Sequence, residues 1–171
     1  ENCDLIIFVL DAKIGLTYDD KYLFKKIRKF NKNIVIVINK TEGKKIVDLS
    51  EVYKLGILDI LNISAEHSQG IINLTDTIKD KLSKKIKLNS KFNSLENKEI
   101  KIAVIGKPNV GKSTLVNSLV NEKRLITGKN AGITRDSIKV SWKVKNYEII
   151  LIDTAGIRKN SKIIEKLESL S

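Results

Sequence analysis

The chain has 171 residues, of which 42% are hydrophobic and 30% charged, as is typical of globular proteins. This length fits one ordinary domain or parts of two, and the composition excludes collagen-like, low-complexity and disulfide-rich proteins. The single cysteine, Cys3, has no partner within the chain, and no apolar run is long enough to cross a bilayer. We therefore expect a protein of the reducing cytoplasm that makes no membrane contact. Methionine is absent and no secretory signal opens the chain, so we also expect both ends to lie within a longer protein.

The net charge of +12 is concentrated in the second half of the chain. Residues 101–171 contain 14 basic and 6 acidic side chains, whereas residues 1–83 contain 13 and 12. Such an excess favours polyanionic partners, namely nucleotides or RNA. A lysine-rich solvated surface would give the same count, so the charge alone leaves both interpretations open.

The first half predicts a parallel sheet covered by helices. Its short apolar runs are typical of buried parallel strands, and the segments between them have the spacing of amphipathic helices. The expected strands are residues 5–10, 34–38 and 57–63, and the expected helices are residues 19–32 and 71–82. In the first helix, Tyr22, Leu23, Lys26, Ile27 and Phe30 share the helical spacing. This alternation of strand and helix predicts an α/β fold.

The second half repeats this rhythm after a polar interval. Residues 84–99 lose the apolar periodicity and are rich in Lys, Asn and Ser, which predicts a solvated linker. The elements expected beyond it are strands at 100–105, 138–144 and 148–152 and helices at 113–120 and 161–170. We expect the last two strands to form an antiparallel hairpin.

A phosphate-binding motif lies between the strand at 100–105 and the helix that follows it. It fits the pattern GxxxxGK[ST] in the strand–loop–helix context that this motif requires. Backbone N–H groups of such a loop and the helix N-terminus face the phosphates, the lysine adds positive charge, and the serine hydroxyl suits Mg²⁺. Its residues are Gly106, Lys107, Pro108, Asn109, Val110, Gly111, Lys112 and Ser113. The sequence therefore predicts a nucleoside triphosphate site here.

A second group with phosphate-site chemistry follows the strand at 148–152. It consists of Asp153, Thr154, Ala155 and Gly156. The Asp153 carboxylate suits the Mg²⁺ shell, and the Gly156 N–H suits the γ-phosphate. Thr134 lies between the two motifs, where its hydroxyl could join the metal only when the γ-phosphate is present.

The first half contains residues suited to recognising guanine. They follow two expected strands and are Asn39, Lys40, Thr41 and Glu42, then Ser64 and Ala65. A carboxylate can accept hydrogen bonds from N1 and N2 of guanine, which adenine does not offer, and a backbone N–H can bind the guanine O6. The pair of motifs therefore predicts selection of GTP over ATP. The only histidine, His67, is interpreted as a solvated loop residue.

These motifs resemble those of the TRAFAC-class GTPases, and within that class the bacterial double-G-domain GTPases called EngA or Der. Residues 11–17, 39–43, 53–56 and 63–67 are similar to the latter part of the first G domain, and residues 106–113, 131–137 and 153–159 to the beginning of the second. The resemblance implies the P-loop NTPase (G-domain) fold, a three-layer α/β sandwich with a mostly parallel sheet. It also implies that residues 1–83 are the C-terminal part of the first G domain, residues 84–99 a linker, and residues 100–171 the N-terminal part of the second.

The activity implied by the resemblance is hydrolysis of GTP to GDP and phosphate during assembly of the large ribosomal subunit. The implied protein is a cytoplasmic monomer that contacts rRNA and uses Mg²⁺. Lys112 and the loop amides would stabilise charge on the transferring phosphoryl group, with Gly156 at the γ-phosphate. Ser113, Thr134 and Asp153 would hold Mg²⁺.

Two positions depart from the usual patterns. Glu42 stands where the family usually has Asp, and its extra methylene displaces the carboxylate by more than a hydrogen bond tolerates unless the loop shifts. Ile157 stands where Ras-like GTPases place the glutamine that orients water, and an apolar side chain cannot do this; it would instead belong to a switch that excludes water. Asn109 is similar to the asparagine of potassium-activated GTPases, which implies a K⁺ ion beside the phosphates.

Two other functions fit the same residues. The guanine motif precedes the phosphate motif, as in circularly permuted GTPases, and the chain contains one of each strand and helix that a single G domain needs. In that case the strands at 5–10 and 100–105, whose inner edges would otherwise be bare, would pair with each other. A non-catalytic RNA-binding module based on the basic second half is the other alternative.

Overall fold

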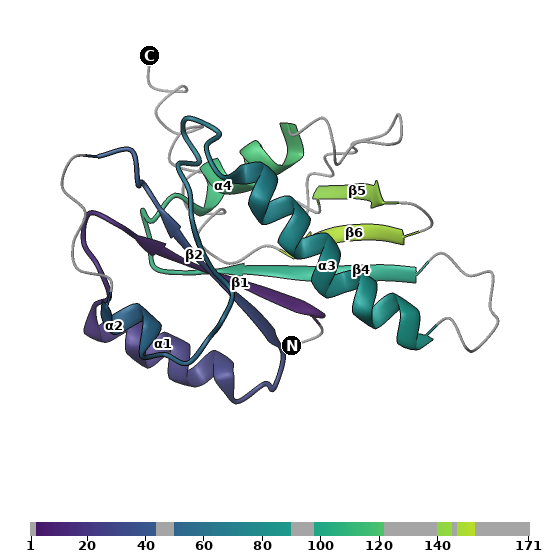
Figure 1. Cartoon of the computed structure of the whole chain (residues 1–171), viewed down its shortest axis with the longest axis horizontal. Coiled ribbons are helices and arrows are strands. Elements are labelled where there is room, and N and C mark those ends of the chain that lie inside the picture. Colours follow the sequence, from purple (N-terminus) through teal and green to yellow (C-terminus); the bar gives the residue numbers. More distant parts are fainter. Residues whose placement is uncertain (1–2, 44–49, 90–97, 122–139, 145–146, 153–171) are drawn as a thin grey trace, which may run out of the picture.

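The strands form one mixed sheet in the computed structural model, which describes all residues except 1–2, 44–49, 90–97, 122–139, 145–146 and 153–171. Within the described residues the sheet has six strands in the order β3-β2-β1-β4-β6-β5 (Figure 1). Five are mutually parallel, and β5 at the edge is antiparallel to β6. The strands are β1 (Leu5–Asp11), β2 (Asn33–Asn39), β3 (Ile60–Asn62), β4 (Lys98–Ile105), β5 (Val140–Val144) and β6 (Tyr147–Ile152).

The central pair of strands joins the two halves of the chain. β1 pairs with β2 on one side and with β4 on the other, and the β1–β4 register runs from Leu5↔Ile102 to Phe8↔Ile105. Asp4 adds two bonds across this junction, because its N–H donates to the Lys101 carbonyl at 2.7 Å and its carboxylate accepts from the Lys101 N–H at 2.9 Å. The pairing that the permuted alternative requires is therefore present.

Helices cover both faces of the sheet, which confirms the three-layer sandwich. They are α1 (Tyr18–Arg28), α2 (Ser50–Tyr53), α3 (Ile71–Asn89) and α4 (Lys112–Asn121). β1 is buried along its whole length because alternate residues face opposite layers. Leu5, Ile7 and Val9 share a core with α3 and α4, whereas Ile6, Phe8 and Leu10 share one with α1 and α2. Figure 1 shows α3 crossing one face and α1 and α2 lying together on the other.

The buried face of α1 differs from the expectation. Asp20, Phe24 and Ile27 are buried, whereas Tyr22 and Phe30 are more than half exposed. Several apolar faces are possible on a helix with this many large side chains. The sheet selects the one on which the Phe24 ring packs 5.6 Å from that of Phe8.

Some element boundaries also differ. The third strand is shorter than expected (β3), and α3 continues through residues 83–89, which we had expected to be partly linker; β4 then begins at Lys98. The short helix α2 was not predicted. The expected hairpin is present as β5 and β6, and the helix expected at 161–170 lies outside the described residues.

This topology places a crevice between β1 and β4. From β1 the chain crosses one face through α1 to reach β2, whereas after β4 it continues into α4 on the other face. Ligands of open α/β sheets bind at such a switch point, outside the carboxyl ends of the strands. The loops that follow β1, β2 and β4 meet at this edge.

Candidate functional site

The loop between β4 and α4 is shaped by two glycines that touch the first half of the chain. A Cβ on Gly106 would lie 2.5 Å from the Val9 carbonyl oxygen, and a Cβ on Gly111 would lie 2.2 Å from Nδ2 of Asn39. Gly111 also has φ +93°, a conformation that side chains disfavour. Asn109 adopts φ +64° in the same loop. The backbone can curl here and approach its neighbours only because both positions lack a side chain.

Lys112 lies buried at the beginning of α4 and folds back over the loop. Its Nζ donates to the carbonyl of Gly106 at 2.9 Å and to that of Lys107 at 2.5 Å. Ser113, the next residue, is half-buried in the first turn of the helix. An ammonium held over a ring of backbone groups at a helix N-terminus is an arrangement suited to binding phosphate.

Asn39 connects this loop to both guanine motifs. Its side chain is buried, and its Nδ2 donates to the Val110 carbonyl at 2.9 Å while its Oδ1 accepts from the Ala65 N–H at 3.0 Å. Ser118 of α4 adds a second link by donating to the Ala65 carbonyl at 2.5 Å. Both ends of the Asn39 amide are satisfied, so three loops from distant parts of the sequence are held together.

Lys40 and Thr41 continue this network. Lys40 adopts φ +67°, and its Nζ lies 2.6 Å from Oδ2 of Asp11 and donates to the Asn109 carbonyl at 2.7 Å. Thr41 bonds the Ile63 carbonyl through both its N–H and its hydroxyl. The side chain of Lys40 thereby spans from the end of β1 to the phosphate loop.

Glu42 lies beside Lys13, which follows β1. Oε1 of Glu42 accepts from Nζ of Lys13 at 3.0 Å, whereas Oε2 is buried and has no hydrogen-bond partner. The backbone N–H of Glu42, the Lys13 ammonium and the Ser64 hydroxyl lower the pKa of the carboxyl from 4.5 to about 2. Glu42 is therefore a permanently charged acceptor at neutral pH.

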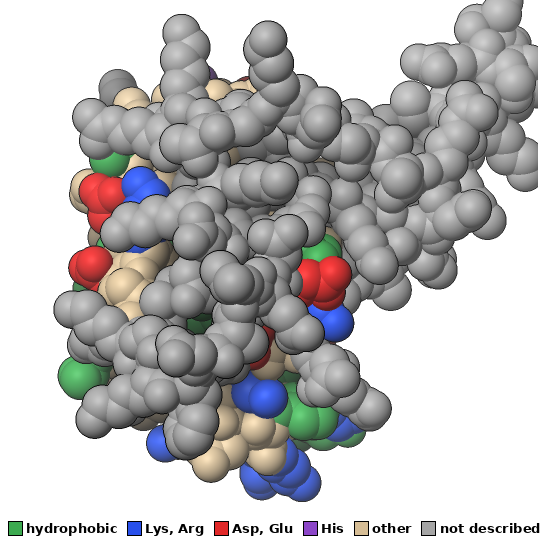
Figure 2. All heavy atoms as spheres, turned by 90° about the vertical axis from the view of Figure 1, so that its right-hand side faces the viewer, with side chains coloured by type: hydrophobic (Ala, Val, Ile, Leu, Met, Phe, Trp, Pro, Cys, Tyr) green, Lys and Arg blue, Asp and Glu red, His purple; other side chains and the backbone are tan. Residues whose placement is uncertain are grey.

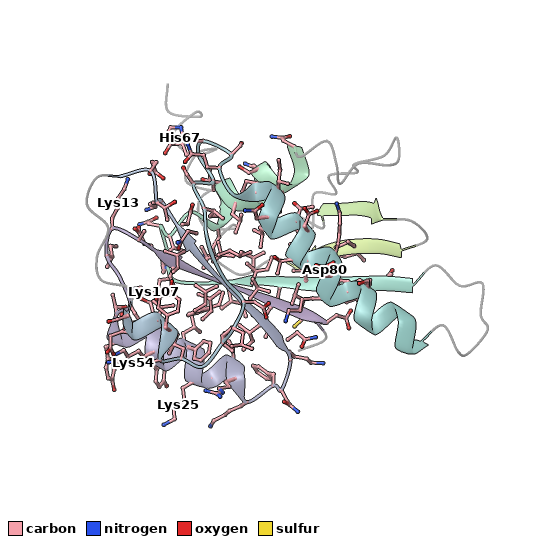
Figure 3. All side chains as sticks on the ribbon, viewed as in Figure 1. Lys13, Lys25, Lys54, His67, Asp80 and Lys107 are labelled. Carbon is pink, nitrogen blue, oxygen red and sulfur yellow. The ribbon has the colours of Figure 1, made fainter. Side chains whose placement is uncertain are left out.

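Lys107 links the phosphate loop to the start of α1. Its Nζ donates to the Thr17 hydroxyl at 2.6 Å and lies 3.4 Å from Oδ2 of the buried Asp20. The loops enclose a cavity of about 170 Å³ lined by Asp11, Ile14, Gly15, Asp20, Lys107, Pro108 and Val110. Figure 3 shows Lys13 and Lys107 at the same end of the sheet.

The structure thus brings together all the predicted site residues that it describes. Thr134, Asp153, Thr154, Ala155, Gly156 and Ile157 lie outside the described residues. His67 is exposed on its loop (Figure 3). The described part of the chain contains no cluster of three or more His, Cys, Asp or Glu side chains that could hold a metal, and no helix long and apolar enough to span a membrane.

Sequence reasoning missed four residues that complete the network, namely Asp11, Lys13, Asp20 and Ser118. Each of these side chains forms an ion pair or hydrogen bond with a residue at least 29 positions away. Asp11 had a usable signal, because it ends an apolar strand directly before the predicted edge of the site. Asp20 had one too, because Thr17 and Asp20 have the spacing of a capping box, whereas nothing local marked the contacts of Lys13 and Ser118.

Comparison with known proteins finds similar sequences. Residues 101–170 match the family described as 50S ribosome-binding GTPase. Over 169 residues, or 98% of the chain, the identity is 47% to GTPase Der of Rickettsia rickettsii (strain Sheila Smith) and 48% to GTPase Der of Rickettsia prowazekii (strain Madrid E). The chain is therefore similar in sequence to part of GTPase Der. It spans 38% of the length of each of these Der proteins.

A solved structure supports the fold of this chain independently. The crystal structure of YjeQ from Thermotoga maritima superimposes with a TM-score of 0.53 at 23% identity, over 87% of this chain and 47% of YjeQ. The superposition extends across both halves of the segment. This likeness confirms the α/β sandwich.

Proposed function

We propose that this chain binds GTP between its two halves, and that it is part of an enzyme that hydrolyses GTP during assembly of the large ribosomal subunit. The observation that carries the proposal is the position of Asn39. It links the Val110 carbonyl of the phosphate loop to the Ala65 N–H of the second guanine motif through one buried side chain. This link supports a single site, because it holds residues suited to the base next to residues suited to the phosphates.

Each end of the nucleotide has suitable partners. Glu42 presents an ionised carboxylate for the guanine N1 and N2 groups. The second guanine motif lies beside it, because the Ser64 hydroxyl is close to this carboxylate and the Ala65 N–H donates to Asn39. Lys112 and the N-terminus of α4 attract the β- and γ-phosphates. The same groups would stabilise the charge that develops on the phosphoryl group as it is transferred.

Two cations belong to the proposal. Hydroxyl and carboxylate oxygens are the ligands that Mg²⁺ prefers, and Ser113, with Thr134 and Asp153, would supply them. When bound, Mg²⁺ neutralises charge on the β- and γ-oxygens. Asn109 would serve K⁺ through its side-chain oxygen, a role supported by the exposed position of this side chain in the loop. Thr134 would join the metal only when the γ-phosphate is present, and the Gly156 N–H would bind that phosphate. Ile157 would exclude water.

The same pairing of β1 with β4 supports a second candidate, in which the two halves form one permuted G domain. In the longer Der proteins, residues 1–83 and 100–171 would instead contribute to two successive G domains joined by residues 84–99. The two arrangements use the same residues for nucleotide binding.

The remaining alternative, a basic RNA-binding module, finds less support in the described surface. In Figure 2 the described side chains of one face include Lys or Arg beside Asp or Glu. Most of the basic surplus of residues 101–171 falls outside the described residues. Contact with rRNA, action in the cytoplasm and a monomeric state are part of the proposal for the whole protein.

Titration with GTP tests the central proposal. We expect saturable binding of GTP in the presence of Mg²⁺, weaker binding of ATP, and loss of at least tenfold in GTP affinity in Lys112→Ala, because the loop loses its positive charge. Calorimetry or a fluorescent GTP analogue measures these affinities.

Lys25→Ala is the matched control for this titration, because Lys25 is exposed on α1 far from the loop (Figure 3). It removes one positive charge without touching the site, so GTP affinity should be unchanged. Equal binding of GTP and ATP, or equal affinity in the two lysine variants, would contradict a GTP site.

A further inference from the structure

The two carboxylate oxygens of Glu42 are in different environments. Oε1 receives the Lys13 ammonium at 3.0 Å, whereas Oε2 is buried without a hydrogen-bond partner. A buried acceptor without a donor is unfavourable, and native proteins usually satisfy such atoms with a protein group, a water or a ligand. Glu42 belongs to the predicted guanine motif, so the orphaned acceptor on its carboxylate indicates where a ligand donor belongs.

The Glu42 side chain is longer than that of aspartate, so its carboxylate must be held in one orientation to bind a ligand. Glutamate has one more rotatable bond than aspartate, so a free Glu42 would sample many positions for its carboxylate. Lys13 lies on the loop after β1, Glu42 follows β2, and Ser64 follows β3. Groups from three strand ends thus converge on one carboxylate, and Lys13 restricts it from the solvent side.

We propose that Lys13 is a positioning residue for guanine recognition, because its ammonium occupies Oε1 of Glu42 and leaves Oε2 directed to accept the N–H groups of guanine. The proposal rests on GTP binding at this site. Restriction of the side chain before binding lowers the entropy lost on binding. The longer carboxylate can then take the place of the aspartate that the family resemblance leads one to expect.

The charges around Lys13 favour this arrangement. Glu42 chiefly, with smaller contributions from Asp11 and Glu66, stabilises the protonated ammonium and raises the pKa of Lys13. Asp11 also accepts the Lys13 backbone N–H at 2.8 Å, which fixes the loop that carries the side chain. Lys13 therefore stays charged and near Glu42 at neutral pH.

Nucleotide affinities of single variants test this role. The Lys13 side chain is half exposed, so the ion pair is worth little by itself, and Lys13→Ala should weaken GTP binding about twofold to fivefold. Lys13→Arg should restore most of the affinity, because it keeps a cation within reach. The urea midpoint of unfolding should be nearly unchanged, and Lys25→Ala serves as the control.

A change in base preference distinguishes positioning from a general effect of charge. ITP lacks the 2-amino group of GTP, so the ratio of GTP to ITP affinity should fall in Lys13→Ala, whereas the ratio should be unchanged in Lys25→Ala. In a Glu42→Asp background the shorter carboxylate lies out of reach of Lys13. There, removal of Lys13 should have no further effect on GTP affinity.

The outcomes separate this inference from the proposed function. Tighter GTP binding in Lys13→Ala would show that Lys13 competes with guanine, and an unchanged GTP:ITP ratio would show that it does not position Glu42; either result overturns the inference while Lys112→Ala still loses binding. If the unaltered chain binds no GTP, both proposals fail.

Discussion

Single side chains hold the site together through buried polar contacts. Asn39 satisfies one donor and one acceptor from loops 71 and 26 positions away, and truncation of such a residue would leave both groups unpaired at a cost of about 1–3 kcal/mol each. Glu42 differs, because its ionised form is stabilised by its own backbone N–H, Lys13 and Ser64. Its contribution to stability therefore depends on pH.

The lowered pKa of Glu42 predicts that its ionised carboxylate contributes to the free energy of unfolding and that this contribution is lost in acid. The folded pKa of about 2 lies below the ordinary value of 4.5, so the ionised carboxylate stabilises the fold fully above pH 4.5. This contribution declines as the pH falls from 4.5 toward 2. We expect the gap in unfolding free energy between the unaltered chain and Glu42→Gln to be widest above pH 4.5 and to narrow below it. Urea unfolding at pH 6, 4 and 3 measures the gap, and one that is constant over this range contradicts the prediction.

Among the elements, α1 connects the fold to the phosphate loop. Thr17 caps the helix in a capping box, in which Asp20 N–H donates to the Thr17 hydroxyl and the Asp20 carboxylate accepts the Thr17 N–H at 3.0 Å. The same hydroxyl accepts the Lys107 ammonium. The cap that starts α1 is thus also the anchor of a side chain from the phosphate loop.

Removal of the capping hydroxyl should destabilise the protein. We expect Thr17→Ala to lower the unfolding free energy by about 1 kcal/mol, the usual effect of losing an N-cap. Thr77→Ala is a matched control, since Thr77 is half-buried like Thr17 and its hydroxyl donates to a carbonyl within α3, and its effect should stay within about 0.5 kcal/mol. Urea denaturation followed by circular dichroism compares the two. Equal effects would show that the cap contributes nothing beyond an ordinary surface threonine.

At the scale of the whole molecule, the β1–β4 pairing predicts that the two halves unfold as one cooperative unit. β1 comes from the first half and β4 from the second, and each is covered on both faces by shared cores. Burial of this kind links the unfolding of one strand to that of its neighbours.

A cavity in β4 should therefore loosen β1 and β2 as well. Ile102 is fully buried and pairs with Leu5, so Ile102→Ala should cost about 2–5 kcal/mol. Hydrogen exchange should show loss of amide protection in β1 and β2 as well as in β4. Ile72→Ala on the exposed side of α3, where the side chain is 41% exposed, should change little. Protection lost in β4 alone would mean that the halves unfold separately.

The sequence by itself determined the local structure and the chemistry of the site. Continuous apolar runs predicted β1 and β2 almost to the residue, because strands buried on both faces need apolar side chains at every position. The motif from Gly106 to Ser113 predicted a loop between strand and helix, because its spacing serves the backbone of a phosphate site. These features depend on a few neighbouring residues, so their patterns are legible along the chain.

Only the tertiary structure decided which distant groups meet. The order of the strands, the face of α1 that packs on Phe8, and the contact of Lys13 with Glu42 all join residues far apart in the sequence. For the β1–β4 pair the sequence offered two bare strand edges and left the pairing a hypothesis. Such contacts are selected by the free energy of the whole packed fold, in which many combinations of apolar faces and charges compete, and no short pattern of residues records the outcome.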